Sequence, residues 1–269
     1  MGQAVEVVTA QGTAIGATLA ALAASAGDSL AVRSFEIGKM AKILQAWADV
    51  QVAGTARIRS PKMHDNVQGM RFDTIIGEPR PQMPLGVSQR VFPNDTIGVD
   101  LAGSAVAGDI EYVAMLIYYE DLPGAAGRFI KADELARRGV NQSWVENTLA
   151  LGTGGGYTGS EAINAEFDQF HADAEYALVG FEVDTECALV GYRGADLGNY
   201  RVAGPGDETI RWVTADWFRR LSVAFDMQLI PVFRANNKAG FNIDGVQDEN
   251  GADTTVISYF VELAPGAVR

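Results

Sequence analysis

The side chains best able to do chemistry in this sequence are its two histidines, His64 and His171. His171 lies between Asp168 and Asp173, so nitrogen and oxygen ligands for a metal occur close together. Their spacing matches no zinc or iron pattern. A serine or cysteine triad would need one histidine as its base, and no nucleophile-elbow pattern surrounds any serine or Cys187. We therefore expect solvated polar loops at both histidines, and we assign no catalytic, metal-binding or cofactor-binding residue and no enzymatic activity.

Two loop-like segments contain residue types that bind ligands in other proteins. Residues 152–159 include the pattern Gly-x-Gly-x-x-Gly, which binds a dinucleotide when it follows a strand and opens a helix. Here it follows a segment with helical signals, so we interpret it as a connecting loop. The acidic segment from Asp244 to Asp253 could offer oxygen ligands to calcium, but the EF-hand spacing and its closing glutamate are missing. We expect a hairpin tip there, before the last strand.

Composition limits the classes of protein that this chain can belong to. Hydrophobic residues make up 48% of the sequence, which is typical of a globular chain. The net charge of -13 argues against a dedicated nucleic-acid binder, because such proteins present a basic face. The cations are 16 Arg and 5 Lys, and arginine is favoured at forked contacts between protein surfaces. The single cysteine, Cys187, lies in an apolar run and is expected to be buried and inert.

The sequence offers no signal for secretion or for membrane insertion. The first residues lack the basic start of a signal peptide. The most apolar stretch, residues 14–25, is too short and too rich in alanine to span a bilayer. We expect neither a cleaved leader nor a spanning helix.

Several helices are expected from spacing and capping. Apolar residues at helical intervals favour helices over residues 9–26 and 36–48. Residues 132–138 end at a glycine, which is a good helix terminator. A capping box opens a helix over residues 143–151, and a Thr-Ala-Asp start opens another over residues 214–221.

Strand signals are more numerous than helix signals. Residues 50–59 alternate between apolar and polar side chains, with Arg57 and Arg59 on the polar face. Residues 222–234 alternate in the same way, and residues 109–120 are apolar on both faces, as in a covered strand. Many short strands separated by turn residues favour a β-sandwich.

The chain carries an internal repeat of its closing strand. Residues 109–124 align without a gap with residues 251–266. Three identities fall in this alignment at a constant offset: Glu120 with Glu262, Pro123 with Pro265 and Gly124 with Gly266. Weaker matches occur at nearby offsets: Phe35-Glu36-Ile37 with Phe181-Glu182-Val183, and Pro61 with Pro205.

The repeat predicts an all-β fold with minor helices, built from two tandem β-sandwiches. The first unit covers residues 1–127 and includes the N-terminal helix. The second covers residues 128–269 and begins with a helical insertion.

This arrangement resembles the double jelly-roll major capsid proteins of tailless icosahedral double-stranded DNA viruses. The resemblance covers most of the chain, but as architecture alone: duplication, an N-terminal helix, short inserted helices and long loops. No residue motif carries over, so no functional residue is transferred. The helical interpretation of residues 36–48 departs from a plain eight-stranded unit.

The resemblance implies a structural virion protein that is assembled in the host cytoplasm. Such subunits form homotrimers whose six similar walls tile like a hexagon. Their partners are copies of themselves, neighbouring capsomers, other virion proteins and, where one exists, an internal membrane. No direct nucleic-acid binding and no cofactor are implied.

Two other classes remain open. A sugar- or surface-binding β-sandwich module, as in fibres or adhesins, would use exposed aromatic rings for stacking, with Trp144, Tyr157 and Trp217 as candidates. A metal-dependent double-sandwich enzyme such as a bicupin needs several histidines at each site, and two histidines outside a His-x-His pair make it the weakest alternative.

Overall fold

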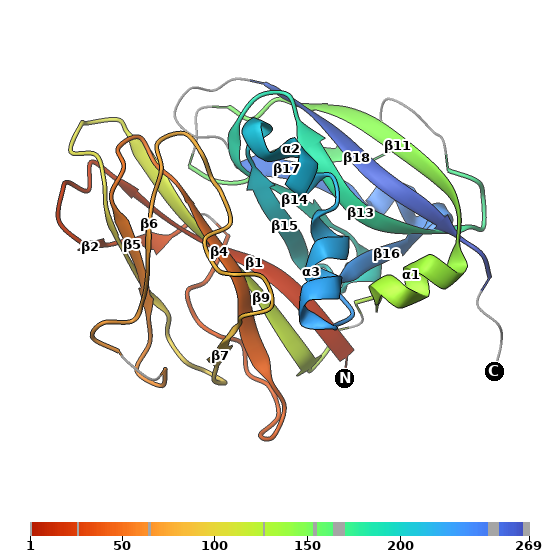
Figure 1. Cartoon of the computed structure of the whole chain (residues 1–269), viewed down its shortest axis with the longest axis horizontal. Coiled ribbons are helices and arrows are strands. Elements are labelled where there is room, and N and C mark those ends of the chain that lie inside the picture. Colours follow the sequence, from red (N-terminus) through yellow and green to blue (C-terminus); the bar gives the residue numbers. More distant parts are fainter. Residues whose placement is uncertain are drawn as a thin grey trace.

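Four antiparallel sheets stacked in series make up the molecule (Figure 1). The computed structural model describes residues 2–25, 27–63, 66–125, 127–152, 155–163, 170–246 and 253–265. The fold class predicted from the sequence, all-β with minor helices in two tandem β-sandwiches, is confirmed.

The first half of the chain forms two of these sheets. The first sheet has the strand order β2-β8-β5-β6, and the second sheet has the order β3-β1-β9-β4-β7. Their strands are β1 (Gly2–Thr13), β2 (Ala20–Ala21), β3 (Ala23–Ala24), β4 (Ala41–Asp49), β5 (Thr55–Arg59), β6 (Met70–Asp73), β7 (Gln89–Val91), β8 (Gly98–Ala102) and β9 (Ile110–Leu122).

The second half forms the other two. The third sheet has the order β12-β17-β14-β15, and the fourth sheet has the order β10-β16-β13-β18-β11. Their strands are β10 (Phe129–Ile130), β11 (Gly139–Leu149), β12 (Thr158–Ala162), β13 (Glu175–Val183), β14 (Cys187–Arg193), β15 (Arg201–Gly206), β16 (Ile230–Arg234), β17 (Asn242–Val246) and β18 (Thr254–Leu263).

Short helices occur in the second half only, within the described residues. The α-helices are α1 (Ala132–Arg138), α2 (Arg211–Thr214) and α3 (Trp217–Phe225), and the 3-10 helices are η1 (Ala195–Leu197), η2 (Glu208–Ile210) and η3 (Ala235–Gly240). Helix α3 packs against strands β13 and β16, beside the junction of the two halves (Figure 1).

The two halves have the same strand wiring. If the short strands β3 and β10 are set aside, each half has eight strands, and they are ordered 1-8-3-6 in one sheet and 2-7-4-5 in the other. The closing strands β9 and β18 therefore occupy equivalent positions. In each half the third strand also bulges against the closing strand, between Ile43 and Gln45 in β4 and between Leu178 and Gly180 in β13. A shared bulge is a local feature that persists within a family, so it supports descent of both halves from one unit.

Two hydrophobic cores fill the stack. The first lies between the first and second sheets, where Ile58 and Val99 meet Val113 and Met115. The second core is larger: it fills the space between the third and fourth sheets and continues to the outward face of the second sheet. The layers therefore run from the first sheet to the fourth without a solvent-filled break.

Two predicted helices near the N-terminus are wrong. Residues 9–13 end strand β1, residues 20–21 and 23–24 form the short strands β2 and β3, and the other residues of 14–25 lie outside strands; residues 41–49 form strand β4. Residues 4–10 and 43–50 are buried on both faces, because the second sheet is covered on each side. A strand buried on both faces loses its alternation, which explains the helical spacing in residues 36–48. Ile15, Leu19 and Leu22, whose spacing predicted the first helix, lie outside the strands.

The predicted helix over residues 143–151 is also wrong, because these residues belong to strand β11. Val145, Asn147 and Leu149 point inward and Trp144 lies half exposed on the other face. Pairing with β18 along the whole strand outweighs the local capping-box signal. The helical insertion predicted at the start of the second half is reduced to α1, which follows β10 and precedes β11.

The region around residues 214–234 divides differently from the prediction. Residues 222–225 end helix α3, and only residues 230–234 form a strand, β16. Helix α3 opens after Asp216 and not after Thr214, and it buries Trp217, Phe218 and Leu221 on one face. That spacing is helical, and it outweighs the alternation seen further along the segment.

Two predicted elements agree closely with the structure. The predicted helix over residues 132–138 is α1, and the covered strand over residues 109–120 is β9. The strand predicted over residues 50–59 is shorter, since β5 begins at Thr55.

The repeat holds for the closing strands but not for the residue register. In β9 the inward residues include Val113, Met115 and Ile117, whereas in β18 they include Ser258 and Phe260. The ungapped alignment places inward residues of β9 on outward residues of β18, so the strand bodies must be shifted by one residue. The weaker matches are wrong: Phe35 precedes β4 whereas Phe181 lies in β13, and Pro61 follows β5 whereas Pro205 lies in β15.

Candidate functional site

An apolar surface joins the two sandwiches. The outward face of the second sheet, with Val7, Leu116 and Trp47, packs on the third sheet. The Trp47 indole N–H donates to the carbonyl oxygen of Ala188 at 3.0 Å, and its ring meets the ring of Trp217 edge-to-face at 6.2 Å. Trp47 and Trp217 are almost completely buried. The halves are therefore joined by buried aromatic rings and a specific hydrogen bond.

A polar cluster lies beside this apolar contact and also crosses it. Asp28, from the first half, accepts hydrogen bonds from the backbone N–H of Thr9 at 2.8 Å and from the Tyr157 hydroxyl of the second half at 3.1 Å. The Arg201 guanidinium lies 3.5 Å from the centre of the Tyr157 ring and pairs with Asp244 at 2.8 Å. Burial raises the pKa of both Asp28 and Asp244, against the opposing effect of their hydrogen bonds.

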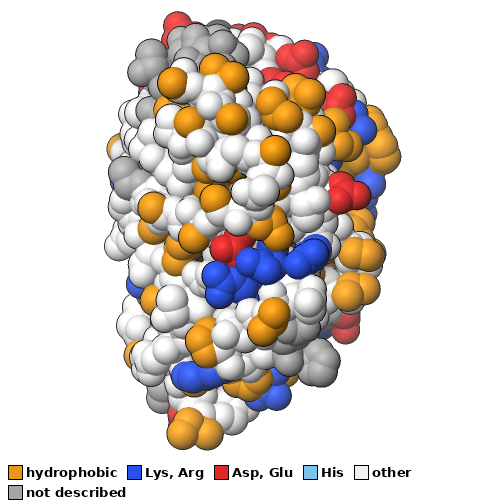
Figure 2. Space-filling model, turned by 90° about the vertical axis from the view of Figure 1, so that its left-hand side faces the viewer, with side chains coloured by type: hydrophobic (Ala, Val, Ile, Leu, Met, Phe, Trp, Pro, Cys, Tyr) orange, Lys and Arg blue, Asp and Glu red, His pale blue; other side chains and the backbone are white. Residues whose placement is uncertain are grey.

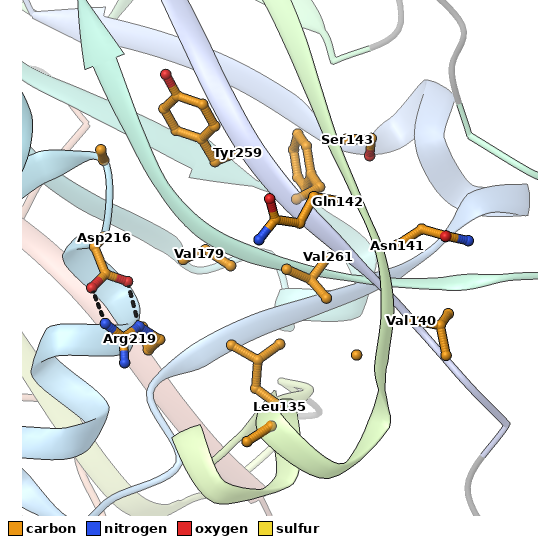
Figure 3. A pocket seen from close by; sticks show the side chains of 14 residues that line it. Leu135, Val140, Asn141, Gln142, Ser143, Val179, Asp216, Arg219, Tyr259 and Val261 are labelled. Carbon is orange, nitrogen blue, oxygen red and sulfur yellow. Dashed lines mark hydrogen bonds and ion pairs between the residues drawn. The ribbon is translucent and has the colours of Figure 1, made fainter.

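The outward face of the fourth sheet, at the far end of the stack, holds a groove of about 490 Å³. It lies between α1 and the start of α3, across strands β11 and β18. Leu135, Val261 and Tyr259 give it an apolar floor, and Gln142 reaches in from β11 (Figure 3). The Asp216–Arg219 ion pair, with an Oδ1–Nε distance of 2.6 Å, borders the groove on the α3 side.

Aromatic and acidic side chains lie beside the groove on the same strands of the fourth sheet. Trp144 is 48% exposed and stands opposite Tyr259 across the β11–β18 pair. Glu146 on β11 and Glu182 on β13 both pair with Ile257 of β18, so two carboxylates flank one apolar residue. An open apolar strip with acidic sides is chemically suited to a partner that is apolar and basic.

The opposite end of the stack is the outward face of the first sheet, and it is basic at its centre. Arg57 and Arg59 both donate to Oδ2 of Asp100 at 2.8 Å, and Arg71 stands exposed on the neighbouring strand. Strand β6 ends at an acidic residue, Asp73. Figure 2 shows this face, with a band of Lys and Arg side chains gathered around an acidic one.

The environment of Asp100 explains its ionisation. Burial raises its pKa, but hydrogen bonds from Arg59 and Arg57 outweigh burial, so the pKa lies below its ordinary value. Asp100 itself is 3% exposed. The carboxylate therefore stays ionised and fixes two guanidinium groups. Arg57 also donates from Nη1 to the carbonyl oxygen of Val67 at 2.9 Å.

The structure does not bring the histidine residues into a site. His64 and Asp168 lie outside the described residues. The ring of His171 contacts Glu262 at 3.0 Å, and its side chain is 72% exposed. Among the described residues no group of three His, Cys, Asp or Glu side chains could hold a metal ion.

The two loop predictions have different outcomes. Gly159 lies at the start of strand β12, so the glycine-rich segment leads into a strand and not into a helix; residues 153–154 lie outside the described residues. The hairpin tip predicted from Asp244 onward is wrong at its start. Asp244 is a buried member of β17, and β17 and β18 belong to different sheets, so they cannot form a hairpin; residues 247–252 are not described.

The remaining sequence candidates separate by burial. Cys187 is buried, as predicted. Trp217 is a core residue, and the Tyr157 hydroxyl is engaged by Asp28. Trp144 alone of the three aromatic candidates presents an exposed ring, and it does so from a strand and not from a helix.

The groove and the arginine cluster were not identified as sites from the sequence. The alternation of residues 50–59 did place Arg57 and Arg59 on a common face. It gave no sign of Asp100, which is 41 residues away from Arg59 in the sequence and meets it only through the pairing of β5 with β8.

Within the described residues no helix is both long and apolar enough to cross a membrane.

Comparisons with known proteins find similarity at the level of three-dimensional structure only. No family model and no curated protein matches the sequence. The crystal structure of the PBSX exported protein XepA is similar over 96% of this chain and 86% of its own, with a TM-score of 0.28 and 8% identity. The crystal structure of the major capsid protein P2 from bacteriophage PM2 is similar over 98% and 99%, with a TM-score of 0.22 and 6% identity. At these scores neither likeness says what this chain does.

Proposed function

We propose that this chain is a structural virion protein, a major capsid subunit that self-assembles as a homotrimer into an icosahedral shell. The wiring of the strands supports the proposal. The orders 1-8-3-6 and 2-7-4-5 are those of an eight-stranded jelly roll, in which two Greek keys fold into two facing sheets. Since both halves have these orders, we propose a double jelly roll.

The observation that carries this function is the head-to-tail stacking of the two halves. The second sheet of one half covers the third sheet of the other, so the first and fourth sheets remain as two unlike end faces. A contact between unlike faces is heterologous, and it generates a closed ring when the rotation between units permits. Three chains would supply six similar walls, which is an outline suited to tiling a shell.

The proposed division of the chain follows from the same topology. Among the described residues, every strand of the first two sheets lies before residue 123, and every strand of the other two lies after residue 128. We place one unit at residues 1–127 and the other at residues 128–269.

The proposed role is non-catalytic. Its partners are copies of the same chain, neighbouring capsomers and other virion proteins, with an internal membrane where the virus has one. The net charge of -13 favours packing between protein surfaces over direct coating of a genome. The protein would assemble in the host cytoplasm and reside in the virion.

Negative-stain electron microscopy of the purified protein, and of virions if a producing virus is available, tests this proposal. Capsomers of hexagonal outline or regular shells are the expected result. A protein that stays monomeric under all solution conditions would contradict the proposal.

A second candidate, a sugar- or surface-binding module, is favoured by one observation: Trp144 is half exposed and pairs across the strands with Tyr259, which lines the groove. An aromatic ring on a groove edge can stack on a sugar ring. Glycan-array binding that disappears in Trp144→Ala, with a monomeric protein, would select this candidate over the capsid subunit.

A further inference from the structure

The two end faces of the stack are equivalents of two faces that already bind each other inside the chain. By strand position, the first sheet corresponds to the third sheet, and the second sheet corresponds to the fourth. The second sheet covers the third within the chain. The fourth sheet of one copy and the first sheet of another are therefore the matching pair of faces that the chain leaves open.

The first and third sheets, which are equivalent, each carry a buried aspartate at the same place in the strand order. Asp100 and Asp244 are each the central residue of the seventh strand, β8 and β17. Each holds arginine on the outward face: Asp100 holds Arg57 and Arg59, and Asp244 holds Arg201, whose side chain crosses over Gly191. The second half thus shows how a face of this kind is covered.

The outward face of the third sheet is contacted by a carboxylate from the first half of the chain. Burial lowers the pKa of Arg201, but its hydrogen bond and ion pair with Asp244 outweigh burial, and the nearby carboxylate of Asp28, from the first half, raises the pKa of Arg201 further. An arginine–aspartate pair on one sheet is therefore met by an acidic group and by apolar side chains of the next sheet.

The second and fourth sheets are the other equivalent pair. The groove on the fourth sheet lies at the positions where the second sheet contacts the third. The bulged residues Leu44 and Val179 are equivalent, and Leu44 belongs to the core that joins the two halves. The one-residue shift between the closing strands places Tyr259 at the position of Leu116 and Val261 at the position of Tyr118. Val179, Tyr259 and Val261 line the groove (Figure 3).

We propose that the outward face of the first sheet of one copy docks on the outward face of the fourth sheet of the next copy, with the groove as its socket. This inference rests on the proposed function and names the surfaces that would carry it. Arg57, Arg59 and Arg71 face the carboxylates of Glu146 and Glu182 across this contact. Charge complementarity selects a second copy of this chain as the occupant, since each copy carries both the basic and the acidic face.

Two face variants test the proposal. Trp144→Arg places a cation on the acidic face, at a side chain that is 48% exposed and can change without disturbing the core. The double variant Ala21→Trp with Arg71→Glu blocks the basic face sterically and reverses one charge, and neither residue holds Asp100. If Trp144→Arg lowers the far-UV circular dichroism signal, Gln142→Arg replaces it, because Gln142 is exposed and lines the same groove.

Multi-angle light scattering after size exclusion gives the masses. The wild type is expected at about 86 kDa, three times the chain mass of 28.7 kDa, and each face variant at the mass of one chain. An equimolar mixture of the two face variants retains one intact face of each kind, so it should form a pair of chains and nothing larger. The matched controls Val106→Arg and Arg90→Glu lie off both faces and should keep the wild-type mass.

The failures are distinguishable. A wild-type oligomer that both face variants leave intact would overturn this contact and leave the capsid proposal standing. A wild type that is monomeric at about 0.1 mM would overturn both this contact and the capsid proposal, because protein contacts of standard size form at lower concentrations. A filament that both variants abolish would support the contact and contradict closure at three chains.

Discussion

Removing the Trp47 side chain tests the fusion of the two sandwiches at its most concentrated point. Trp47 is fully buried, donates one hydrogen bond across the interface and meets Trp217 edge-to-face. Truncating a buried tryptophan to alanine costs about 3–5 kcal/mol through lost burial and the cavity left behind. The Ala188 carbonyl also loses its donor. We expect Trp47→Ala to lower the free energy of unfolding by about 4 kcal/mol.

Trp47→Phe separates the two contributions. A phenyl ring keeps much of the apolar contact with Trp217 but cannot donate to Ala188, so the loss should fall to about 1–3 kcal/mol, the cost of an unsatisfied buried acceptor. A double-mutant cycle of Trp47→Ala with Trp217→Ala should give a coupling of about 0.5–1.5 kcal/mol, as measured for aromatic pairs.

Urea unfolding followed by far-UV circular dichroism measures these differences. Trp144→Ala is the matched control, since the same truncation at a half-exposed position should change stability by no more than about 0.5 kcal/mol. If Trp47→Ala costs less than about 1 kcal/mol, Trp47 does not lie in a packed contact between the second and third sheets, and our reasoning about the stack is refuted.

Two further changes probe other parts of the stack. Asp100→Asn should cost about 2 kcal/mol at pH 7, because Arg57 and Arg59 lose a charged acceptor. The pKa of Asp100 is lowered in the folded protein, so its stabilisation is present above its ordinary value of 3.8 and is lost as the pH falls below it. Urea titrations should therefore show the difference between wild type and variant shrinking below that pH; a difference that grows there would contradict this assignment. Gly180→Ala would bring a Cβ within 2.3 Å of the Thr214 carbonyl oxygen, so thermal unfolding should report a loss of about 1–3 kcal/mol. An unchanged melting temperature would show that α2 does not press on β13.

The fold class could be predicted from the sequence because its strongest signals are strands that repeat. Strand β9 is apolar on both faces and recurs as β18, and the two occupy equivalent places in the sheets. The exact register could not be predicted, since bulges insert single residues, and one residue reverses the faces of a strand. The identity of Glu120 with Glu262 therefore falls in an ungapped alignment that is wrong by one residue along the body of the two strands.

The wrongly predicted helices have different physical origins. Strand β4 lies in a sheet that is covered on both sides, so every position favours an apolar residue and the two-residue period disappears. The apolar residues that predicted a helix over residues 9–26 lie between short strands, where alanine-rich turns imitate a helical pattern. In β11 the alternation of Trp144 and Val145 was present, but the capping-box residues gave a competing local signal. Long pairing with β18 decides the structure there, and single-sequence patterns do not contain it.

The candidate surfaces depend on contacts that are distant in the sequence. The polar face of β5 could be predicted from the alternation that includes Arg57 and Arg59. Its carboxylate, Asp100, comes from β8, and the groove on the fourth sheet combines α1, β11, β18 and α3. Neither surface has a motif, because each is defined by the stacking of sheets and not by the spacing of residues.

The mass of the wild-type protein in solution, measured by light scattering over a range of concentrations, tests the central claim most directly. Twin sandwiches joined head-to-tail, with two complementary end faces left open, should give a particle of three chains at about 86 kDa. A single chain of 28.7 kDa at every concentration would contradict the account.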